Sequence, residues 1–253
     1  MEPLLHPGLD PSPVEWINRG VASPVLLICE HAGKAVPRAL GNLGLCDEDL
    51  SKHIGWDPGA AEVTRAMARI LGCPAVLQTY SRLVIDCNRP PDAPDAMPAV
   101  SDGVTIPGNS AIGPEVRATR IASIFDPFHA AVTVARGSGP SLLLSIHSFT
   151  PQLMSQGGPR PWHIGCLGRN DTSTSQRLLD KIGTLRPDLT LALNQPYQID
   201  DESDWFVPKH GEPSGLPHSL VEIRQDLIRD EEGIEQMAAL LCKALQPLLE
   251  TTC

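Results

Sequence analysis

Aromatic side chains, positive charge and long hydrophobic runs are all scarce in this sequence. Only 4% of the 253 residues are aromatic, and 20 lysines and arginines stand against 30 aspartates and glutamates, which gives a net charge of −10. Nucleic-acid binding needs clustered positive charge, and base stacking needs aromatic rings. No apolar run approaches the ~20 residues that cross a bilayer. We therefore expect neither a nucleic-acid partner nor a membrane partner.

Paired cysteine motifs are missing as well. The seven cysteines include no Cys-x-x-Cys pair, so the sequence predicts neither a thiol redox motif nor a cysteine-ligated zinc ribbon. Residues 1–7 also lack the basic and apolar regions of a secretory signal peptide. Together these features favour a cytoplasmic protein, and they carry no signal for its oligomeric state.

Hydrophobic residues make up 42% of the chain and form short apolar runs that alternate with amphipathic stretches. The apolar runs predict strands at 24–29, 75–79, 83–86, 142–146, 163–167, 189–193 and 219–223. The amphipathic stretches predict helices at 58–71, 114–135, 173–185 and 230–249. Nearly continuous apolar strands separated by helices are typical of a three-layer α/β/α fold with a mixed, mainly parallel central sheet. We expect a single domain of this α/β class over residues 1–253.

Local signals refine this outline. Pro127 predicts a kink in the second helix, and Asp230 is placed to cap the last one. Residues 1–22 are expected to form an N-terminal extension, and 90–113, rich in proline and glycine, a long loop. A second loop is expected at 196–217. Long loops within a compact domain often close over or line binding sites.

Two histidines come directly after predicted strands. His31 follows the strand at 24–29, and His147 follows the strand at 142–146. Ligands of open α/β sheets bind beyond the carboxyl ends of the strands, and imidazole is a good ligand for zinc. The two histidines could therefore share a divalent metal ion. The alternative is that each is a hydrogen-bonded histidine at the end of a strand.

Catalytic zinc usually has three protein ligands and one open position, so a third ligand is needed. Asp57 lies just before the helix at 58–71 and could supply a carboxylate. It could instead simply cap that helix. Glu30 and His53 are alternative ligands.

Glu222 lies inside the apolar strand predicted at 219–223. A lone carboxylate is costly there unless it has a partner or a function. Beside a metal-bound water it could act as a general base. The alternative is an ion pair with Arg224 or another arginine.

Arg82, Asn88 and Arg89 surround the strand predicted at 83–86. Arginine presents a planar fork of donors that binds carboxylates, so these residues favour an acidic substrate group. Each arginine taken alone could instead form a surface salt bridge.

Three of these segments resemble the zinc carboxypeptidase-like fold. They read SIHSF at 145–149, DCNR at 86–89 and LVEIR at 220–224. In that fold the matching residues are a zinc-ligand histidine, an Asn-Arg pair that holds the substrate carboxylate, and the catalytic glutamate. The peptidases of this fold carry His-x-x-Glu, but the fourth position here is Lys34, which cannot bind a metal while protonated. The second ligand is therefore expected elsewhere, at Asp57.

A fuller resemblance, over roughly 23–226, is to the N-formylglutamate amidohydrolase family. The segment EHAGKAVP at 30–37 is similar to the family's His-Ser-Gly-Arg…Pro element, with alanine in place of the usual serine. The segments HIGWDPGA at 53–60 and SRLVIDCNR at 81–89 resemble its next two elements.

This resemblance implies a metal-dependent amidohydrolase that splits a small acidic N-acyl amino acid. The leading substrate is N-formylglutamate, with formate and glutamate as products, as in histidine breakdown. The implied metal, Zn²⁺ or another divalent ion, would be held by His31, Asp57 and His147. The implied catalytic residues are Glu222 and Arg82, and the implied substrate-binding residues are Lys34, Arg82, Asn88 and Arg89. Another zinc peptidase or deacylase on the same scaffold stays open, as does a non-catalytic relative that binds an acidic metabolite.

Overall fold

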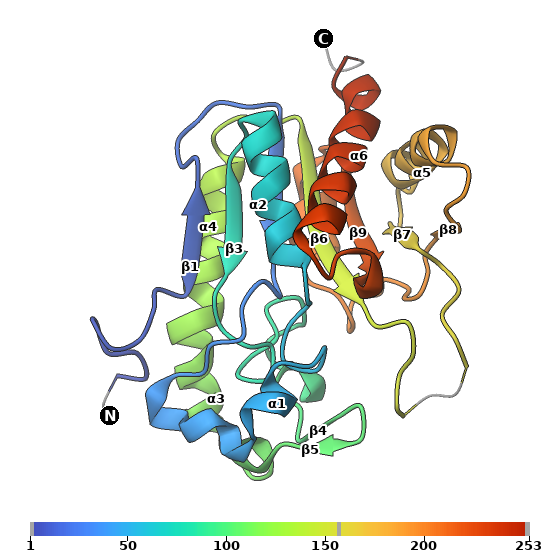
Figure 1. Cartoon of the computed structure of the whole chain (residues 1–253). Coiled ribbons are helices and arrows are strands. Elements are labelled where there is room, and N and C mark those ends of the chain that lie inside the picture. The colour runs from blue at the N-terminus through green and yellow to red at the C-terminus, as the bar shows by residue number, and fades with distance from the viewer. Residues whose placement is uncertain (1–2, 156–157, 251–253) are drawn as a thin grey trace.

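Seven strands form the central sheet of the computed structural model, which describes residues 3–155 and 158–250. The strand order is β1-β3-β2-β6-β9-β7-β8 (Figure 1). The strands are β1 (Val14–Ile17), β2 (Val25–Cys29), β3 (Ala75–Gln78), β6 (Leu142–Phe149), β7 (Ile164–Leu167), β8 (Leu191–Leu193) and β9 (His218–Arg224). Only the β1–β3 and β7–β9 pairs are antiparallel, and the other four pairs are parallel. The predicted mixed, mainly parallel sheet is confirmed.

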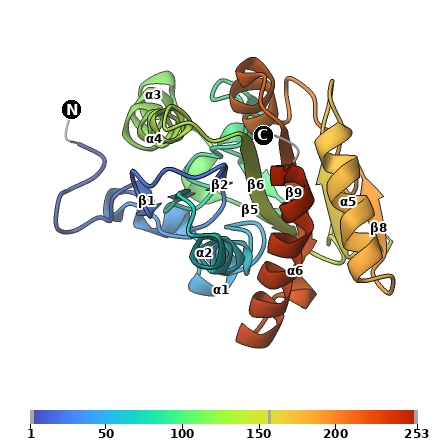
Figure 2. The ribbon, with the colours of Figure 1, turned by 90° about the horizontal axis from the view of Figure 1, so that it is seen from above.

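Helices cover both faces of this sheet. Helices α2 (Ala60–Leu71), α5 (Ser173–Leu185) and α6 (Glu231–Glu250) share one hydrophobic core. Helices α3 (Pro114–Arg120) and α4 (Asp126–Arg136) lie on the opposite face, where α4 joins a second core. Figure 2 shows α4 and α2 on opposite sides of the strands. The three-layer α/β/α arrangement is therefore as predicted.

The central strands explain why the apolar runs predicted them so well. All five side chains of β2 are buried, and they alternate between the cores: Leu27 packs in the first and Leu26 in the second. All eight residues of β6 are also buried. Strands covered on both faces need apolar side chains at nearly every position.

The strand predicted at 83–86 is wrong. Residues 81–84 form a turn, in which the Val84 N–H donates to the Ser81 carbonyl at 2.9 Å. Side chains satisfy the neighbouring carbonyls in place of a strand partner: Asn109 Nδ2 donates to Leu83 at 2.8 Å, and Arg120 donates to Val84 at 3.0 Å. The apolar run is buried in the second core without joining the sheet. Apolarity alone does not distinguish these two environments.

The helices follow the predictions with one structural difference. A π-helical turn, Ile121–Phe125, separates α3 from α4 just before Pro127. Such a turn accommodates a residue that has no N–H to donate. The predicted cap of α6 is present, because Asp230 Oδ1 accepts the N–H of Gly233 at 2.9 Å.

The segments outside the predicted elements also contain regular structure. Residues 1–22 supply β1, which pairs with β3. Residues 90–113 contain a small hairpin of β4 (Val100–Ser101) and β5 (Val104–Thr105). Its turn places Asp102 and Gly103 at φ of 41° and 81°, the left-handed conformation that tight hairpin turns need. Together with the short helix α1 (Asp47–Leu50), this hairpin lies at the carboxyl ends of β3 and β6 (Figure 1).

Short helical turns complete the described chain. The 3₁₀ turns are Arg38–Gly44, Pro94–Ala96, Pro107–Asn109, Glu212–Ser214 and Gln225–Leu227, and a further π-helical turn is Val207–Gly211. Within residues 3–155 and 158–250, no helix combines the length and the apolar character needed to cross a membrane.

Two histidines pair behind the sheet. His129 on α4 and His210 in the turn Val207–Gly211 have Nδ1 and Nε2 2.9 Å apart, and their rings stack. Removal from water lowers the pKa of His129 to about 3 and that of His210 to about 4. Each pKa lies below its ordinary value of 6.5, so the unfolded chain takes up protons that the native chain does not.

Stability is therefore expected to fall as the pH drops below 6.5. The loss in the free energy of unfolding between pH 7 and pH 5.5 is about 1 kcal/mol per histidine. Urea unfolding of the wild type, His210→Gln and the control His6→Gln at both pH values measures it. The His210→Gln variant should lose part of the pH dependence, and the control should keep all of it. An unchanged pH dependence in His210→Gln would contradict this assignment.

Candidate metal centre and active site

Three predicted ligands meet at the carboxyl ends of two neighbouring strands. His31 follows β2, His147 lies near the end of β6, and these strands are parallel partners. Asp57 comes from the segment that leads into α2. Its Oδ2 lies 3.3 Å from His31 Nδ1 and 2.9 Å from His147 Nδ1, and the two Nδ1 atoms are 3.1 Å apart. All three residues are buried, and together they could hold a metal ion.

The far side of each imidazole is fixed by a carboxylate. His31 Nε2 donates to Asp86 Oδ1 at 2.7 Å, and His147 Nε2 donates to Glu30 Oε2 at 3.0 Å. Ser145 Oγ also donates to Glu30. Because an ionised carboxylate only accepts hydrogen bonds, these contacts leave the Nδ1 atoms to face Asp57. Such carboxylates behind ligating histidines orient the rings and increase their basicity.

The charges in this cluster support one another. Burial alone would raise the pKa of Asp57, but the two histidines outweigh it and hold this pKa well below its usual range. Burial likewise opposes the charge on His147, yet Asp57 and Glu30 raise its pKa well above the ordinary value. A cluster of side chains that binds a proton so strongly also favours a metal cation, which competes with protons for the same lone pairs. Two imidazole nitrogens and one carboxylate oxygen are also a usual ligand set for zinc.

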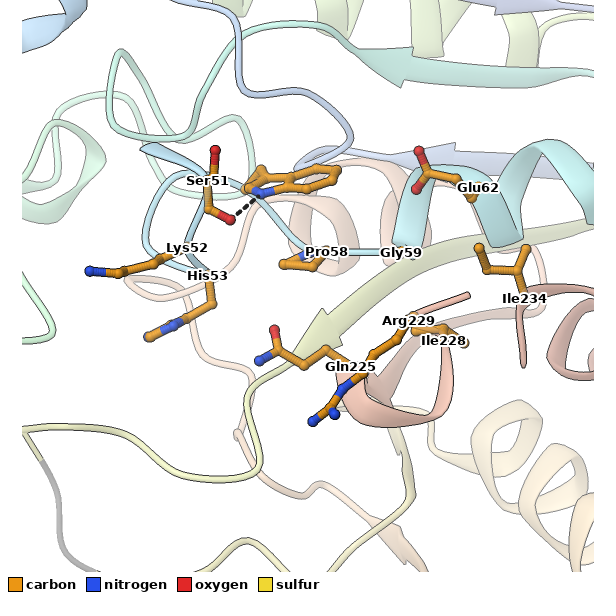
Figure 3. A pocket seen from close by; sticks show the side chains of 11 residues that line it. Ser51, Lys52, His53, Pro58, Gly59, Glu62, Gln225, Ile228, Arg229 and Ile234 are labelled. Atoms are coloured by element: carbon orange, nitrogen blue, oxygen red, sulfur yellow. Dashed lines mark hydrogen bonds between the residues drawn. The ribbon is translucent and has the colours of Figure 1, made fainter. Parts of the chain in front are cut away.

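Asp57 does not cap the helix that follows it. Gly59 precedes α2 and no side chain caps the helix, whereas the Asp57 carboxylate accepts hydrogen bonds from the Ser148 N–H and from Arg82. The neighbours Trp56 and Pro58 line a separate outer groove of about 440 Å³ (Figure 3). The chain therefore directs Asp57 inward and its two neighbours outward.

Glu222 lies beside His147, because the two residues are directly paired between β9 and β6. Its side chain is buried, and among the described residues its Oε2 has no hydrogen-bond partner. Burial, with a smaller contribution from Asp57, raises the pKa of Glu222 to about 7. The alternative pairing with Arg224 does not form, because Arg224 binds Asp226 at 2.7 Å. Glu222 is thus a carboxyl group that can take up or release a proton near neutral pH.

One cavity of about 420 Å³ joins these groups. Its lining includes the three candidate ligands and Glu222, together with polar residues from β6 and three loops: Arg82, Asn88, Arg89, Ser148, Arg160, Tyr197, Gln198, Ser203 and Asp204. Positive groups therefore face the cavity in a chain whose net charge is −10.

The predicted substrate-binding residues have different surroundings. Arg82 binds Asp86 through Nε and a terminal nitrogen, at 3.0 and 2.7 Å, and also reaches Asp57. Arg89 lines the cavity but binds Asp95 and the Ser203 carbonyl. Both arginines are thus already engaged by groups of the protein.

Asn88 mainly anchors the loop at 196–217. It donates to Asp204 at 2.8 Å and accepts the N–H groups of Trp205 and Phe206 at 3.1 and 2.9 Å. Burial raises the pKa of Asp204 to about 6. The predicted loop is thereby tied to the segment at 81–89.

Lys34 is not among the residues that line the cavity. Its Nζ donates to Ser51 Oγ at 3.0 Å and lies over the Trp56 ring. The two alternative ligands also lie apart from the cluster of Nδ1 atoms and Asp57. Glu30 binds the far side of His147, and His53 Nε2 lies 3.0 Å from Asp102.

Sequence reasoning assigned no role to Asp86 or Arg160. Asp86 is part of the DCNR segment that carries the family resemblance, so its place in that segment was a usable signal. Arg160 lies in the irregular segment between β6 and β7, and it carries no comparable signal.

Comparison with known proteins decides the family. The sequence model of N-formylglutamate amidohydrolase matches residues 23–229. The chain belongs to the N-formylglutamate amidohydrolase family. No curated protein is similar enough to this sequence to count as a match.

Solved structures agree with this membership. A gene product of Agrobacterium tumefaciens, Atu2144, is 34% identical, with a TM-score of 0.91 over 98% of this chain and 99% of that one. An N-formylglutamate amidohydrolase from Ralstonia eutropha JMP134 is 22% identical, with a TM-score of 0.68 over 95% and 98% of the two chains. The second likeness shows the same fold. This family member is thus an amidohydrolase of N-acyl amino acids, and its buried His-Asp-His group is compatible with a divalent metal.

Replacing a ligand should abolish metal binding, and replacing a carboxylate behind a histidine should weaken it. We expect His147→Ala to lose Zn²⁺, and Asp86→Asn and Glu30→Gln to bind it about 10- to 100-fold more weakly. Competition with a chromophoric chelator measures these affinities, and the surface variant Asp188→Asn is the control. Wild-type affinity in His147→Ala would rule out this centre.

Proposed function

We propose that this family member hydrolyses N-formylglutamate to formate and glutamate, with zinc held by His31, Asp57 and His147. One observation carries the proposal: a buried His-Asp-His cluster lies beside Glu222, which is paired with His147 between β9 and β6, and all four residues line one cavity. Among the described residues, Glu222 Oε2 has no hydrogen-bond partner. The family membership supports the choice of substrate.

A divalent ion bound by these three residues would polarise the formyl carbonyl and lower the pKa of a water molecule. Glu222 accepts a proton from the attacking water, whose oxygen forms a bond to the formyl carbon. Glu222 then delivers that proton to the amide nitrogen as the C–N bond breaks. The remaining proton of the added water passes from the nascent formic acid to the released amine. The products are therefore formate and glutamate with a protonated amino group, and atoms and charges balance.

Arg82 is placed to stabilise the negative charge that develops on the carbonyl oxygen. Its guanidinium lines the cavity and contacts Asp57 at 3.3 Å, next to the cluster where the reaction takes place. Fixed positive charge in a partly buried site stabilises such a transition state. Arg82 is held by Asp86, so it is oriented before the substrate arrives.

Asn88 and Arg89 contribute to substrate binding by shaping the cavity. Their hydrogen bonds to Asp204 and Ser203 hold the loop at 196–217 against the cavity.

The substitution of Lys34 for a ligating glutamate does not leave the centre short of a carboxylate, because Asp57 supplies one. This completeness favours a catalytic protein over a non-catalytic metabolite-binding relative. By family resemblance, we place the reaction in histidine breakdown in the cytoplasm.

Removing the Glu222 carboxylate should stop turnover without removing the metal. We expect Glu222→Gln to keep its zinc but to lower kcat by about 10²- to 10⁴-fold, the usual contribution of a general acid–base. Formate release and metal content are measured on the same samples, with Glu62→Gln in the outer groove as a matched control. Full activity in Glu222→Gln, or a wild type that binds no metal, would overturn the mechanism.

A substrate panel tests the acyl group. We expect kcat/KM for N-formylglutamate to exceed that for N-acetylglutamate and for glutamyl dipeptides by at least about 10-fold, since an added methyl changes binding in a shaped pocket by that order. Release of glutamate gives one assay for all three. Faster hydrolysis of a dipeptide would favour the peptidase alternative.

A further inference from the structure

The three arginines that line the catalytic cavity differ in their partners. Arg82 binds Asp57 and Asp86, and Arg89 binds Asp95. Arg160, in contrast, forms no ion pair with any carboxylate within residues 3–155 and 158–250. Its guanidinium donates to the Tyr197 hydroxyl at 2.9 Å and lies 3.5 Å from the Thr150 carbonyl. A guanidinium has five N–H donors, so most of those of Arg160 are available to a ligand.

Aromatic rings orient this available guanidinium. Its central carbon lies 5.0 Å from the centroid of the Tyr197 ring and 5.9 Å from that of Phe149. Stacking on aromatic faces leaves the edge of the guanidinium free for a carboxylate, which it binds with two parallel hydrogen bonds. The Tyr197 hydroxyl accepts from Arg160 and can donate its own proton to the same carboxylate.

The backbone that carries Arg160 is held at two points. Arg224, at the end of β9, donates to the carbonyls of Arg160 and Pro161 at 3.3 Å each. Asp102, in the β4–β5 turn, accepts the N–H groups of Met154 and Ser155 at 3.0 and 2.7 Å. The β4–β5 hairpin therefore holds the backbone at Met154 and Ser155, and Asp102 is a positioning residue for Arg160.

Arg82 and Arg160 lie at different distances from the ligand cluster within the cavity. Arg82 contacts Asp57 of the ligand cluster, so its guanidinium lies next to the position of the reacting carbonyl. Arg160 contacts none of the three candidate ligands, and its hydrogen-bond partner Tyr197 is 42% exposed, so this part of the cavity lies nearer the solvent. A carboxylate bound by Arg160 is therefore farther from the scissile amide.

We infer that Arg160, with the Tyr197 hydroxyl, binds the carboxylate remote from the scissile amide and thereby selects acidic N-acyl amino acids over neutral ones. This inference rests on the proposed function and adds the residue that sets its specificity. It also places the substrate's second negative charge beside an arginine that pairs with no carboxylate of the described residues.

Kinetics on an acidic substrate and its neutral isostere test the inference. With Arg160→Gln, KM for N-formylglutamate should rise about 10- to 100-fold, the loss expected for a charge-assisted, two-bond contact. KM for N-formylglutamine should change far less, so the preference for the acid falls. Arg229→Gln, which removes the same charge from the outer groove, should leave both constants unchanged. An undiminished preference in Arg160→Gln would overturn the inference.

Three further variants separate binding from folding. Arg160→Lys keeps the charge but loses the planar fork, so its KM should be intermediate. Tyr197→Phe removes one hydroxyl and should raise KM about 3- to 10-fold with little change in kcat, the loss expected for a single hydrogen bond. Asp102→Asn should also raise KM more than kcat. Equal losses of KM and kcat for acidic and neutral substrates in all three would indicate a structural role instead.

Ligand binding distinguishes failure of this inference from failure of the proposed function. Calorimetric titration with glutarate, a dicarboxylate without an amide, requires no turnover. Binding to the zinc-loaded wild type that is lost in Arg160→Gln would support the inference even if N-formylglutamate is not hydrolysed. Equal binding to both proteins would overturn it even if N-formylglutamate is hydrolysed.

Discussion

The site depends on how one buried carboxylate, that of Asp86, is neutralised. Asp86 accepts hydrogen bonds from His31, from Arg82 and from the backbone N–H of Asn88. A buried carboxylate without such partners would be strongly unfavourable. By satisfying it, the chain orients a candidate metal ligand, fixes an arginine beside the reacting group and shapes the segment at 81–89. Three functional elements thus follow from one electrostatic requirement.

The sequence predicted the central sheet because strands such as β2 and β6 are buried on both faces and are therefore apolar throughout. The same criterion failed at residues 83–86, of which the first three are also apolar and buried. There Asn109 and Arg120 occupy the carbonyls that a neighbouring strand would have used. Asn109 and Arg120 lie 26 and 36 positions along the chain from the carbonyls that they bind. A local sequence pattern cannot reveal such contacts.

The candidate centre was predictable for a related reason. His31 follows β2 and His147 lies near the end of β6, and these two buried strands are parallel partners, so chain topology alone brings the histidines together. Of the orienting partners, Glu30 was considered only as an alternative ligand and Asp86 was assigned no role, since their contacts with the histidines depend on side-chain directions. Arg160 depends on hydrogen bonds to Tyr197 and from Arg224, made between loops distant in sequence. Such contacts produce no periodic pattern in the sequence.

The helix formed by α3, the π-helical turn and α4 has a mechanical consequence for the cavity. Through Arg120 it holds Asn109 and the carbonyl of Val84, and thus the loop at 90–113 and the segment at 81–89. Through His129 it contacts Trp205 and His210 in the opposite loop. The segment at 81–89 and the loop at 196–217, which both line the cavity, are therefore held by the same helix. A displacement of this helix would carry both with it, so the cavity would move without a change in the width of its mouth.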